Sequence, residues 1–134
     1  MASIFTKIIN GDIPCYRVAE DEKNIAFLDI SPLKKGHTLC VPKLEVDELY
    51  ELPTEDYNSL MAFSQKVAKA LKSAVPCARV GSIVLGMEVP HAHLHLVPIN
   101  AEQELSFTNT RVSLNQEEMA ELAKSISDAL DSAE

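Results

Sequence analysis

The sequence predicts an α+β fold, in which a five-stranded antiparallel sheet carries one long helix and a C-terminal helix. Two observations predict it. Strand-like segments form one group before a long helical pattern and a second group after it, rather than alternating regularly with helices. The 134 residues are 46% hydrophobic and 24% charged, which suffices for the core of one domain over residues 1–134.

The segment up to Pro42 is expected to contain a short helix and three strands. Residues 3–9 have helical character and end at Asn10-Gly11, a dipeptide typical of turns. A charged turn at residues 20–23 joins the first two strands, and Pro42 stops the third because it has no backbone N–H. The expected strands are residues 16–19, 24–29 and 37–41.

A long amphipathic helix is expected between Pro53 and Pro76. Thr54 is its predicted N-cap, and Pro76 ends it because proline cannot continue a helix. Apolar residues recur at helical spacing along this segment and predict one buried face. That face consists of Tyr57, Leu60, Met61, Ser64, Val67, Ala68, Leu71, Ala74 and Val75.

Two further strands and a last helix are expected in the remainder of the chain. The strands are residues 79–85 and 91–97, separated by a bend at residues 86–90. The helix, at about residues 115–130, begins with a capping box formed by Asn115 and Glu118. Its apolar stripe consists of Met119, Leu122, Ala123, Ile126, Ala129 and Leu130.

Charge and composition exclude several classes of function. The net charge of −8 argues against nucleic-acid binding, which needs a basic surface. No apolar run reaches the ~18 residues that span a bilayer, and the N-terminus lacks the organisation of a signal peptide. Cys15, Cys40 and Cys77 are odd in number and far apart, which favours free thiols. We therefore expect a cytoplasmic protein without a membrane or nucleic-acid partner.

Three of the four histidines stand in strict alternation at His91, His93 and His95. Alternate residues of a strand face the same side, so a strand here would project them as one row, roughly 7 Å apart. The apolar residues between them would face a core. Histidine exchanges a proton near neutral pH more readily than any other side chain.

The row by itself leaves three explanations open. The first is phosphate chemistry, with one imidazole as nucleophile and its neighbours binding or protonating the phosphate and the leaving group. The second is a metal site, since zinc takes three histidines and a water, with His37 the only other histidine. The third is a solvated histidine-rich strand without a function.

Residues 91–97 fit the pattern His-φ-His-φ-His-φ-φ, with φ apolar, and so resemble the histidine triad (HIT) family. Other segments resemble that family in order and spacing, and the likeness extends over about residues 4–98. By its length and opening segment the chain is most similar to the bacterial Hint-like branch of purine nucleoside phosphoramidases. The supporting segments are residues 4–14, 26–32, 36–43 and 86–90.

The resemblance implies a HIT-like homodimer with two-fold symmetry that hydrolyses or transfers nucleotides. Its substrate would be a nucleoside 5′-phosphoramidate or related conjugate of a purine nucleotide (AMP- or GMP-type), and no cofactor or metal is needed. His93 would form a covalent nucleotidyl-histidine, and His95 would contact the phosphate and help protonate the leaving group. His91 and His37 would orient the row through hydrogen bonds.

The resemblance also implies a nucleoside pocket. Asp29 would accept hydrogen bonds from the ribose hydroxyls, and backbone N–H groups around Glu88 and Val89 would contact the phosphate. Apolar side chains would wall the base. They are Phe5, Ile8, Phe27, Leu28, Ile30 and Leu39.

The chain departs from the family pattern at several positions. A zinc site found in many members uses an early Cys-x-x-Cys pair and histidines, but Ser3, Thr6 and Glu45 occupy three of its positions, so no structural zinc is expected. Met87 stands where glutamine is usual, and residues 77–85 lack the usual Asn-x-Gly.

These departures keep alternative functions open: a dinucleoside polyphosphate hydrolase, a nucleotide-binding protein with little turnover, or, more remotely, a metal hydrolase. The segment after Asn100 is also open. Its Glu102, Glu104 and Asn109 either reach a partner's site or form a solvated loop.

Overall fold

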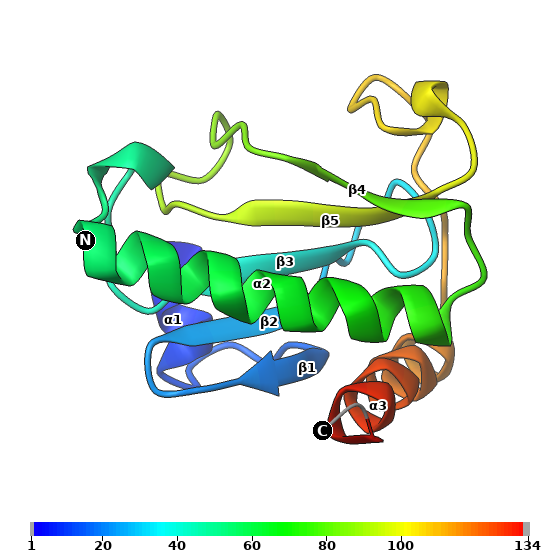
Figure 1. Cartoon of the computed structure of the whole chain (residues 1–134), viewed down its shortest axis with the longest axis horizontal. Coiled ribbons are helices and arrows are strands. Elements are labelled where there is room, and N and C mark those ends of the chain that lie inside the picture. Colours follow the sequence, from blue (N-terminus) through cyan, green and yellow to red (C-terminus); the bar gives the residue numbers. More distant parts are fainter. Residues whose placement is uncertain (1, 133–134) are drawn as a thin grey trace.

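The computed structural model describes residues 2–132, and within them it contains a five-stranded sheet and three α-helices (Figure 1). The α+β prediction is confirmed. The elements are α1 (Ile4–Ile9), β1 (Arg17–Glu20), β2 (Asn24–Leu28), β3 (Thr38–Pro42), η1 (Leu49–Glu51), α2 (Thr54–Ala74), β4 (Arg79–Ile83), β5 (Leu94–Ile99), η2 (Glu102–Glu104) and α3 (Gln116–Ser132), where η marks a 3-10 turn.

The sheet has the strand order β1-β2-β3-β5-β4, and each neighbouring pair is antiparallel. The register sets Phe27 of β2 opposite Leu39 of β3, and Leu39 opposite His95 of β5. Ile83 of β4 lies opposite His95 on its other side. Directly paired residues share a face of the sheet, so these four side chains form one row across four strands.

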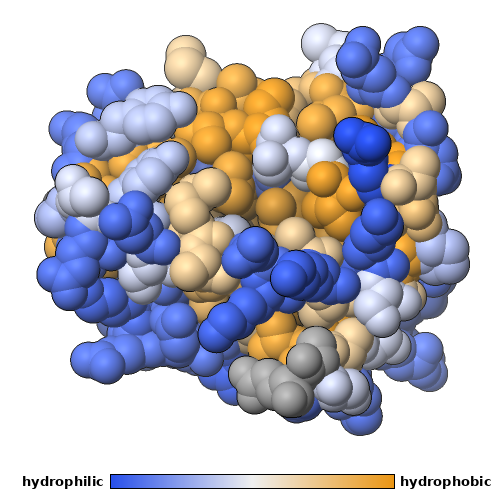
Figure 2. All heavy atoms as spheres, viewed as in Figure 1, coloured by the Kyte–Doolittle hydropathy of each residue, from blue (hydrophilic) through white to orange (hydrophobic). Residues whose placement is uncertain are grey.

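Helices α2 and α3 cover one face of the sheet (Figure 1). The strand residues that pack against these helices alternate along each strand with the residues of the row just described, because successive side chains of a strand point to opposite faces. Hydrophilic residues dominate the left and lower parts of this side of the molecule, as expected where both helices turn polar faces outward (Figure 2). The strand residues in this core are Val18, Ala26, Leu28, Cys40, Leu94 and Leu96.

The apolar face predicted for α2 needs one correction. Met61 is 38% exposed, whereas Phe63 and Ala70, which the sequence reading left out, are buried. Thr54 is the first residue of α2 rather than its N-cap, and the N-cap is Pro53 without a side-chain hydrogen bond. For α3 the predicted capping box is confirmed: the Asn115 and Glu118 side chains each accept the other's backbone N–H, at 2.8 and 3.0 Å.

The opposite face of the sheet carries a smaller core, formed by Phe5, Ile25, Phe27, Leu39 and Val41. Phe5 comes from α1, a helix of 6 residues whose N-cap, Ser3, accepts the N–H of Thr6. Because α1 is short, it covers only part of this face. In the uncovered part, His93 and His95 line a cavity.

The fifth strand begins at Leu94, three residues later than predicted. Pairing with β3 stops at the pair Cys40–Leu94, because Pro42 near the end of β3 has no N–H to bond. The Ala92 N–H bonds instead to the Val46 carbonyl, at 2.8 Å. His91 and His93 therefore lie in the segment before the strand, and only His95 is within it. Within the described residues, no helix is long and apolar enough to cross a bilayer.

Candidate functional site

A cavity of about 700 Å³ opens on the uncovered face of the sheet. His93 and His95 line it, together with α1 and residues 85–89. It brings together every residue predicted for the nucleoside pocket, whereas His37 and His91 are fully buried behind it. The predicted pocket residues in its lining are Phe5, Ile8, Phe27, Leu28, Asp29, Ile30, Leu39, Glu88 and Val89. The structure thus assembles the set, and the role of each residue stays a prediction.

His93 is held so that one ring nitrogen is fixed and the other is free. Its Nδ1 lies 2.7 Å from the His91 carbonyl oxygen, which can only accept, so Nδ1 carries the proton. The lone pair is then on Nε2, which has no hydrogen-bond partner in the described part of the chain. Burial lowers the pKa of His93 from its ordinary 6.5, which favours this neutral, nucleophilic form.

The proton positions of His37 and His95 follow from a backbone amide. The Leu33 N–H donates to Nδ1 of His37 at 3.0 Å, so the His37 proton is on Nε2. That Nε2 lies 2.9 Å from Nδ1 of His95, which must accept, and the His95 proton is therefore on its Nε2. Burial lowers the pKa of His37 to about 4 and that of His95 to about 3. His95 thus carries an N–H donor on Nε2, and its ring lies beside that of His93, with the two ring centres 4.8 Å apart.

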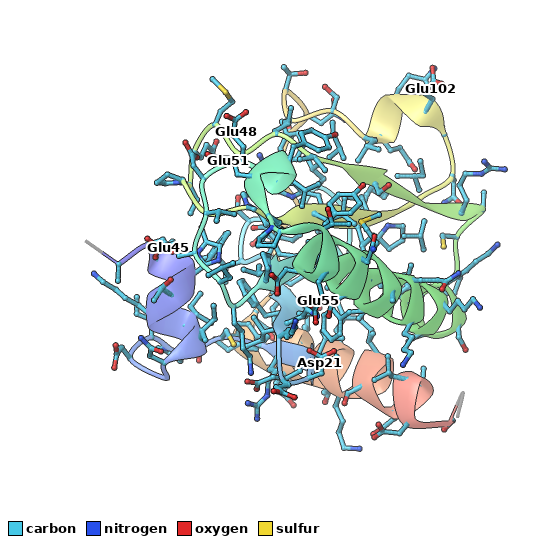
Figure 3. The ribbon with its side chains drawn as sticks, turned by 60° about the vertical axis from the view of Figure 1, so that its left-hand side comes forward. Asp21, Glu45, Glu48, Glu51, Glu55 and Glu102 are labelled. Atoms are coloured by element: carbon cyan, nitrogen blue, oxygen red, sulfur yellow. The ribbon has the colours of Figure 1, made fainter. Side chains whose placement is uncertain are left out.

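A polar cluster ties His91 to α1, and we call Ser3, Thr6, Glu45 and His91 the latch. His91 Nε2 donates to the Pro42 carbonyl at 2.8 Å, so Nδ1 accepts from the Ser3 hydroxyl at 2.6 Å. Glu45 Oε1 accepts the Ser3 N–H at 2.8 Å and the Thr6 hydroxyl at 2.6 Å. Figure 3 shows Glu45 beside α1. The latch fixes the His91 backbone, whose carbonyl orients His93.

Neither polar cluster is a good metal site. Ligand atoms of Asp29, His37 and His95 lie within 4.8 Å of one another. A metal-bound histidine donates its second N–H outward, but Nδ1 of His37 accepts one from Leu33, which leaves the proton on the nitrogen that would bind metal. The latch offers two hydroxyls where zinc favours thiolate and imidazole. The absence of a metal stays a prediction.

Sequence reasoning missed several residues of the cavity, and two of them, Phe107 and Arg111, lie far along the chain from the predicted set. The Phe107 ring packs edge-on against His95, with ring centres 4.8 Å apart, and Arg111 lies over Phe107. Two of the three polar residues considered in this segment bond within the chain: Glu104 to Lys34 and the Asn100 N–H, and Asn109 to the Gln103 carbonyl. An isolated phenylalanine in a polar stretch was the available signal.

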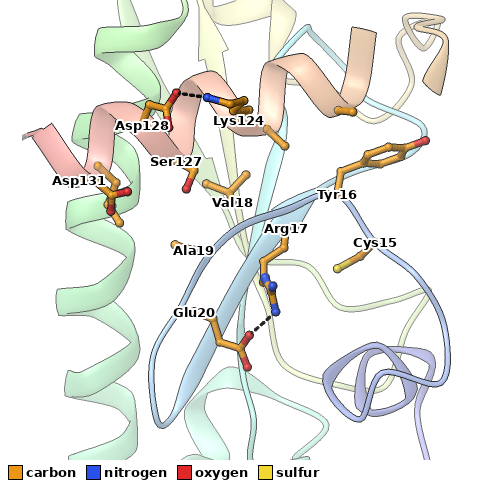
Figure 4. Close-up of a pocket in the computed structure, with 13 residues that line it drawn as sticks. Cys15, Tyr16, Arg17, Val18, Ala19, Glu20, Lys124, Ser127, Asp128 and Asp131 are labelled. Atoms are coloured by element: carbon orange, nitrogen blue, oxygen red, sulfur yellow. Dashed lines mark hydrogen bonds and ion pairs between the residues drawn. The ribbon is translucent and has the colours of Figure 1, made fainter. Parts of the chain in front are cut away.

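A second groove, of about 610 Å³, lies between β1 and α3 (Figure 4). Its charged side chains are largely paired with each other, Arg17 with Glu20 at 2.9 Å and Lys124 with Asp128 at 2.8 Å. None of the four histidines is in its lining. The two histidines that line a cavity, His93 and His95, are therefore in the first one.

Residues 10–102 match the family model described as HIT domain. The chain belongs to the HIT family. The resemblance noted from the sequence is thereby confirmed, and the HIT triad is His91, His93 and His95. Phe107 and Arg111 lie beyond the matched residues.

Known HIT proteins are similar over nearly the whole chain. A Schizosaccharomyces pombe protein named adenosine 5′-monophosphoramidase is 34% identical over 129 residues, which cover 95% of this chain and 97% of that protein. A solved structure of a zinc-bound histidine triad family protein from Mycobacterium smegmatis has a TM-score of 0.85 at 31% identity, covering 100% of this chain and 99% of the other. The solved structure of a HIT-like protein from Bartonella henselae has a TM-score of 0.82 at 32% identity, with 95% of each chain covered.

Proposed function

We propose that this protein is a nucleotide hydrolase that cleaves purine nucleoside 5′-phosphoramidates through a covalent nucleotidyl-histidine on His93. The observation that carries the proposal is the state of His93: Nδ1 is held by a carbonyl, Nε2 is unpaired among the described residues, and the ring lines the cavity. A neutral imidazole fixed in this way is an activated nucleophile. Relatives named adenosine 5′-monophosphoramidase support the choice of reaction.

The nucleoside is assigned to the apolar end of the cavity. Phe5 and Phe27, with ring centres 5.5 Å apart, and Ile8 would contact the base. Asp29 has one carboxylate oxygen occupied by the Ser31 N–H at 2.8 Å. Its other oxygen is the acceptor that we assign to the ribose hydroxyls. The apolar walls suit the broad face of a purine.

The chemistry divides into two displacements at the α-phosphorus. In the first, Nε2 of His93 bonds to phosphorus while the phosphorus–nitrogen bond breaks, and its electron pair stays on the amine. In the second, a water oxygen bonds to phosphorus, the bond to Nε2 breaks and its pair returns to His93. The water's surplus proton passes to solvent. Two moderate barriers replace one high barrier.

We propose for His95 a narrower role than the sequence resemblance implied, and its hydrogen bonds support this choice. His95 is neutral, with one proton, and a neutral imidazole does not give up its last proton near neutral pH. The amine is therefore protonated when the substrate binds, and it departs as a neutral amine. His95 Nε2–H donates to a phosphoryl oxygen and stabilises the charge that develops there. His37 and His91 are positioning residues for this arrangement.

Release of AMP from adenosine 5′-phosphoramidate tests the proposal. Wild type should turn over, with or without chelator, and His93→Ala should lose on the order of 10³-fold or more in kcat. Ser73→Ala, at an exposed position of α2, is the control and should behave as wild type. An inert wild type that still binds AMP would contradict hydrolysis and favour a nucleotide-binding protein.

We also propose that the chain forms a two-fold dimer. The support is β4, an edge strand whose outer backbone groups have no partner strand within residues 2–132. Such an edge pairs readily with a second copy of itself. Light scattering on the purified protein should give twice the chain mass, and a monomer at micromolar concentration would contradict the proposal.

A further inference from the structure

The carboxylate of Asp29 lines the cavity and also reaches the buried pair of His37 and His95. Asp29 follows the last residue of β2, and its backbone N–H bonds to the His37 carbonyl at 2.9 Å. Oδ1 of the carboxylate accepts the Ser31 N–H at 2.8 Å. Oδ2 lies 3.6 Å from Nε2 of His37. Because Oδ1 is occupied, Oδ2 is the oxygen that a ribose hydroxyl and His37 have in common.

The Nε2–H of His37 therefore has two acceptors near it. Nδ1 of His95, at 2.9 Å, accepts the hydrogen bond, whereas Oδ2 of Asp29 is too distant for one. The charge of the carboxylate still acts across that distance, and screening is weak because the His37 side chain is fully buried. A negative charge close to this N–H makes it a poorer donor, so Asp29 weakens the bond that orients His95.

The charge of Asp29 also opposes the work proposed for His95. Burial lowers the pKa of His37 to about 4, and the Asp29 carboxylate acts in the opposite direction. Ligand atoms of Asp29 and His95 lie within 4.8 Å of each other. A carboxylate there disfavours the negative charge that develops on the phosphoryl oxygen beside His95. Hydroxyl groups that donate to Oδ2 would offset part of the carboxylate's charge and remove this disadvantage.

We propose that Asp29 couples recognition of the ribose to the chemical step. When ribose hydroxyls bind Oδ2, the His37 Nε2–H is left to His95 alone, and His95 becomes a better donor to the phosphoryl oxygen. Asp29 is then a positioning residue for His95 as well as a contact of the sugar. The inference rests on the proposed function, which places the ribose at Asp29, and it adds that the sugar accelerates the reaction rather than only binding.

Two matched substrates test the coupling: adenosine 5′-phosphoramidate and its 2′,3′-dideoxy analogue. The measured quantity is the single-turnover rate at saturating protein, which excludes product release and is independent of affinity. Wild type should react at least about fivefold faster with the ribose substrate, the lower end of typical coupling between sites. Equal saturated rates, with only the affinity lowered for the dideoxy analogue, would overturn the inference.

Asp29→Asn makes the sharper prediction, because the amide keeps an oxygen for the Ser31 N–H and loses the charge. It should raise the saturated rate of the dideoxy substrate until the two substrates react at nearly the same rate. A residue that only holds the structure together would lower that rate. Asp128→Asn on α3 removes an equal charge outside this cavity and should keep the wild-type ratio. A dideoxy rate that Asp29→Asn lowers or leaves unchanged would contradict the coupling.

His37→Asn tests the path through the histidine pair. An asparagine can still accept the Leu33 N–H, but its amide is too short to reach the place of Nε2. The ratio of saturated rates should fall to about one in this variant. The ratio of affinities should stay as in wild type, because Asp29 still binds the ribose. A wild-type ratio of rates in folded His37→Asn would show that the effect does not pass through His37.

NMR of the nucleoside complexes separates this inference from the proposed function. In the His93→Ala background with 15N-labelled histidine, adenosine should move the His37 Nε2–H resonance downfield, as expected for a stronger hydrogen bond to His95. The 2′,3′-dideoxyadenosine complex should show no such shift, and neither nucleoside should produce it in Asp29→Asn. Adenosine that binds by calorimetry without moving this resonance would overturn the inference alone. Adenosine that does not bind would overturn the proposed nucleoside site and the inference with it.

Discussion

At the scale of single residues, the protonation of the site is decided by two backbone groups. The His91 carbonyl can only accept and the Leu33 N–H can only donate, so they determine which nitrogen of His93 and of His37 carries the proton. His95 follows from His37. His93 and His95 are both neutral imidazoles, but their neighbours place the proton on different ring nitrogens. His93 therefore offers a free Nε2 as nucleophile, whereas His95 offers an Nε2–H as hydrogen-bond donor.

The lowered pKa of His93 is directly measurable. Burial disfavours the imidazolium, so the ring should stay neutral as the pH falls through 6.5 and take up its proton only below that value. NMR titration of the ring C–H resonances checks this, with His93→Ala identifying the signal. In 8 M urea all histidines should titrate near ~6.5, which provides the internal control. A His93 midpoint at or above 6.5 in the folded protein would contradict the account.

At the scale of elements, the latch connects α1 to the segment before β5. These parts are 88 residues apart at the Ser3–His91 bond, and the N-cap of α1 serves also as the donor to a buried imidazole. One side chain thereby starts a helix and holds the residue whose carbonyl orients His93. Loss of that hydroxyl should affect both stability and catalysis.

Ser3→Ala removes both functions of the hydroxyl. The loss of the N-cap costs about 1 kcal/mol, and an unsatisfied Nδ1 on fully buried His91 costs about 1–3 kcal/mol more. Urea unfolding should therefore show a loss of roughly 2–4 kcal/mol, with Ser73→Ala on the exposed side of α2 close to wild type. A Ser3→Ala protein as stable as the control would show that the latch does not hold α1.

The elements also show how far the sequence can be read. Turn residues and prolines at the boundaries predicted the five strands, and the Asn115–Glu118 spacing predicted the start of α3, because these signals are local. The late start of β5 was not predicted, since it depends on the missing N–H of Pro42 in another strand. Phe107 and Arg111 were missed for the same reason: their contacts with His95 and Ser31 cross the chain and leave no periodic signal.

At the scale of the whole molecule, the fold keeps two histidines neutral in its interior. Burial lowers the pKa of His37 to about 4 and of His95 to about 3, below the ordinary 6.5 of the unfolded chain. Between these values the unfolded state binds more protons than the folded state. As far as these two histidines are concerned, the free energy of unfolding is therefore highest above pH 6.5. It decreases as the pH falls from 6.5 toward 4.

This linkage predicts a loss of stability on mild acidification. At pH 5 each of the two histidines should lower the free energy of unfolding by on the order of 2 kcal/mol relative to pH 7. Urea midpoints at pH 7, 6 and 5 measure it. This window lies above the ordinary 4.5 of carboxyl groups such as Glu45, so it isolates the histidines. A midpoint that does not change between pH 7 and pH 5 would contradict neutral burial.

The central claim is that His93 carries the nucleotide during the reaction. The most direct measurement is mass spectrometry of the protein quenched within milliseconds of mixing with adenosine 5′-phosphoramidate. The account predicts an added AMP group, located by peptide mapping to the segment that contains His93 and absent from His93→Ala. Turnover of the substrate by His93→Ala at the wild-type rate, or an adduct on another residue, would contradict it.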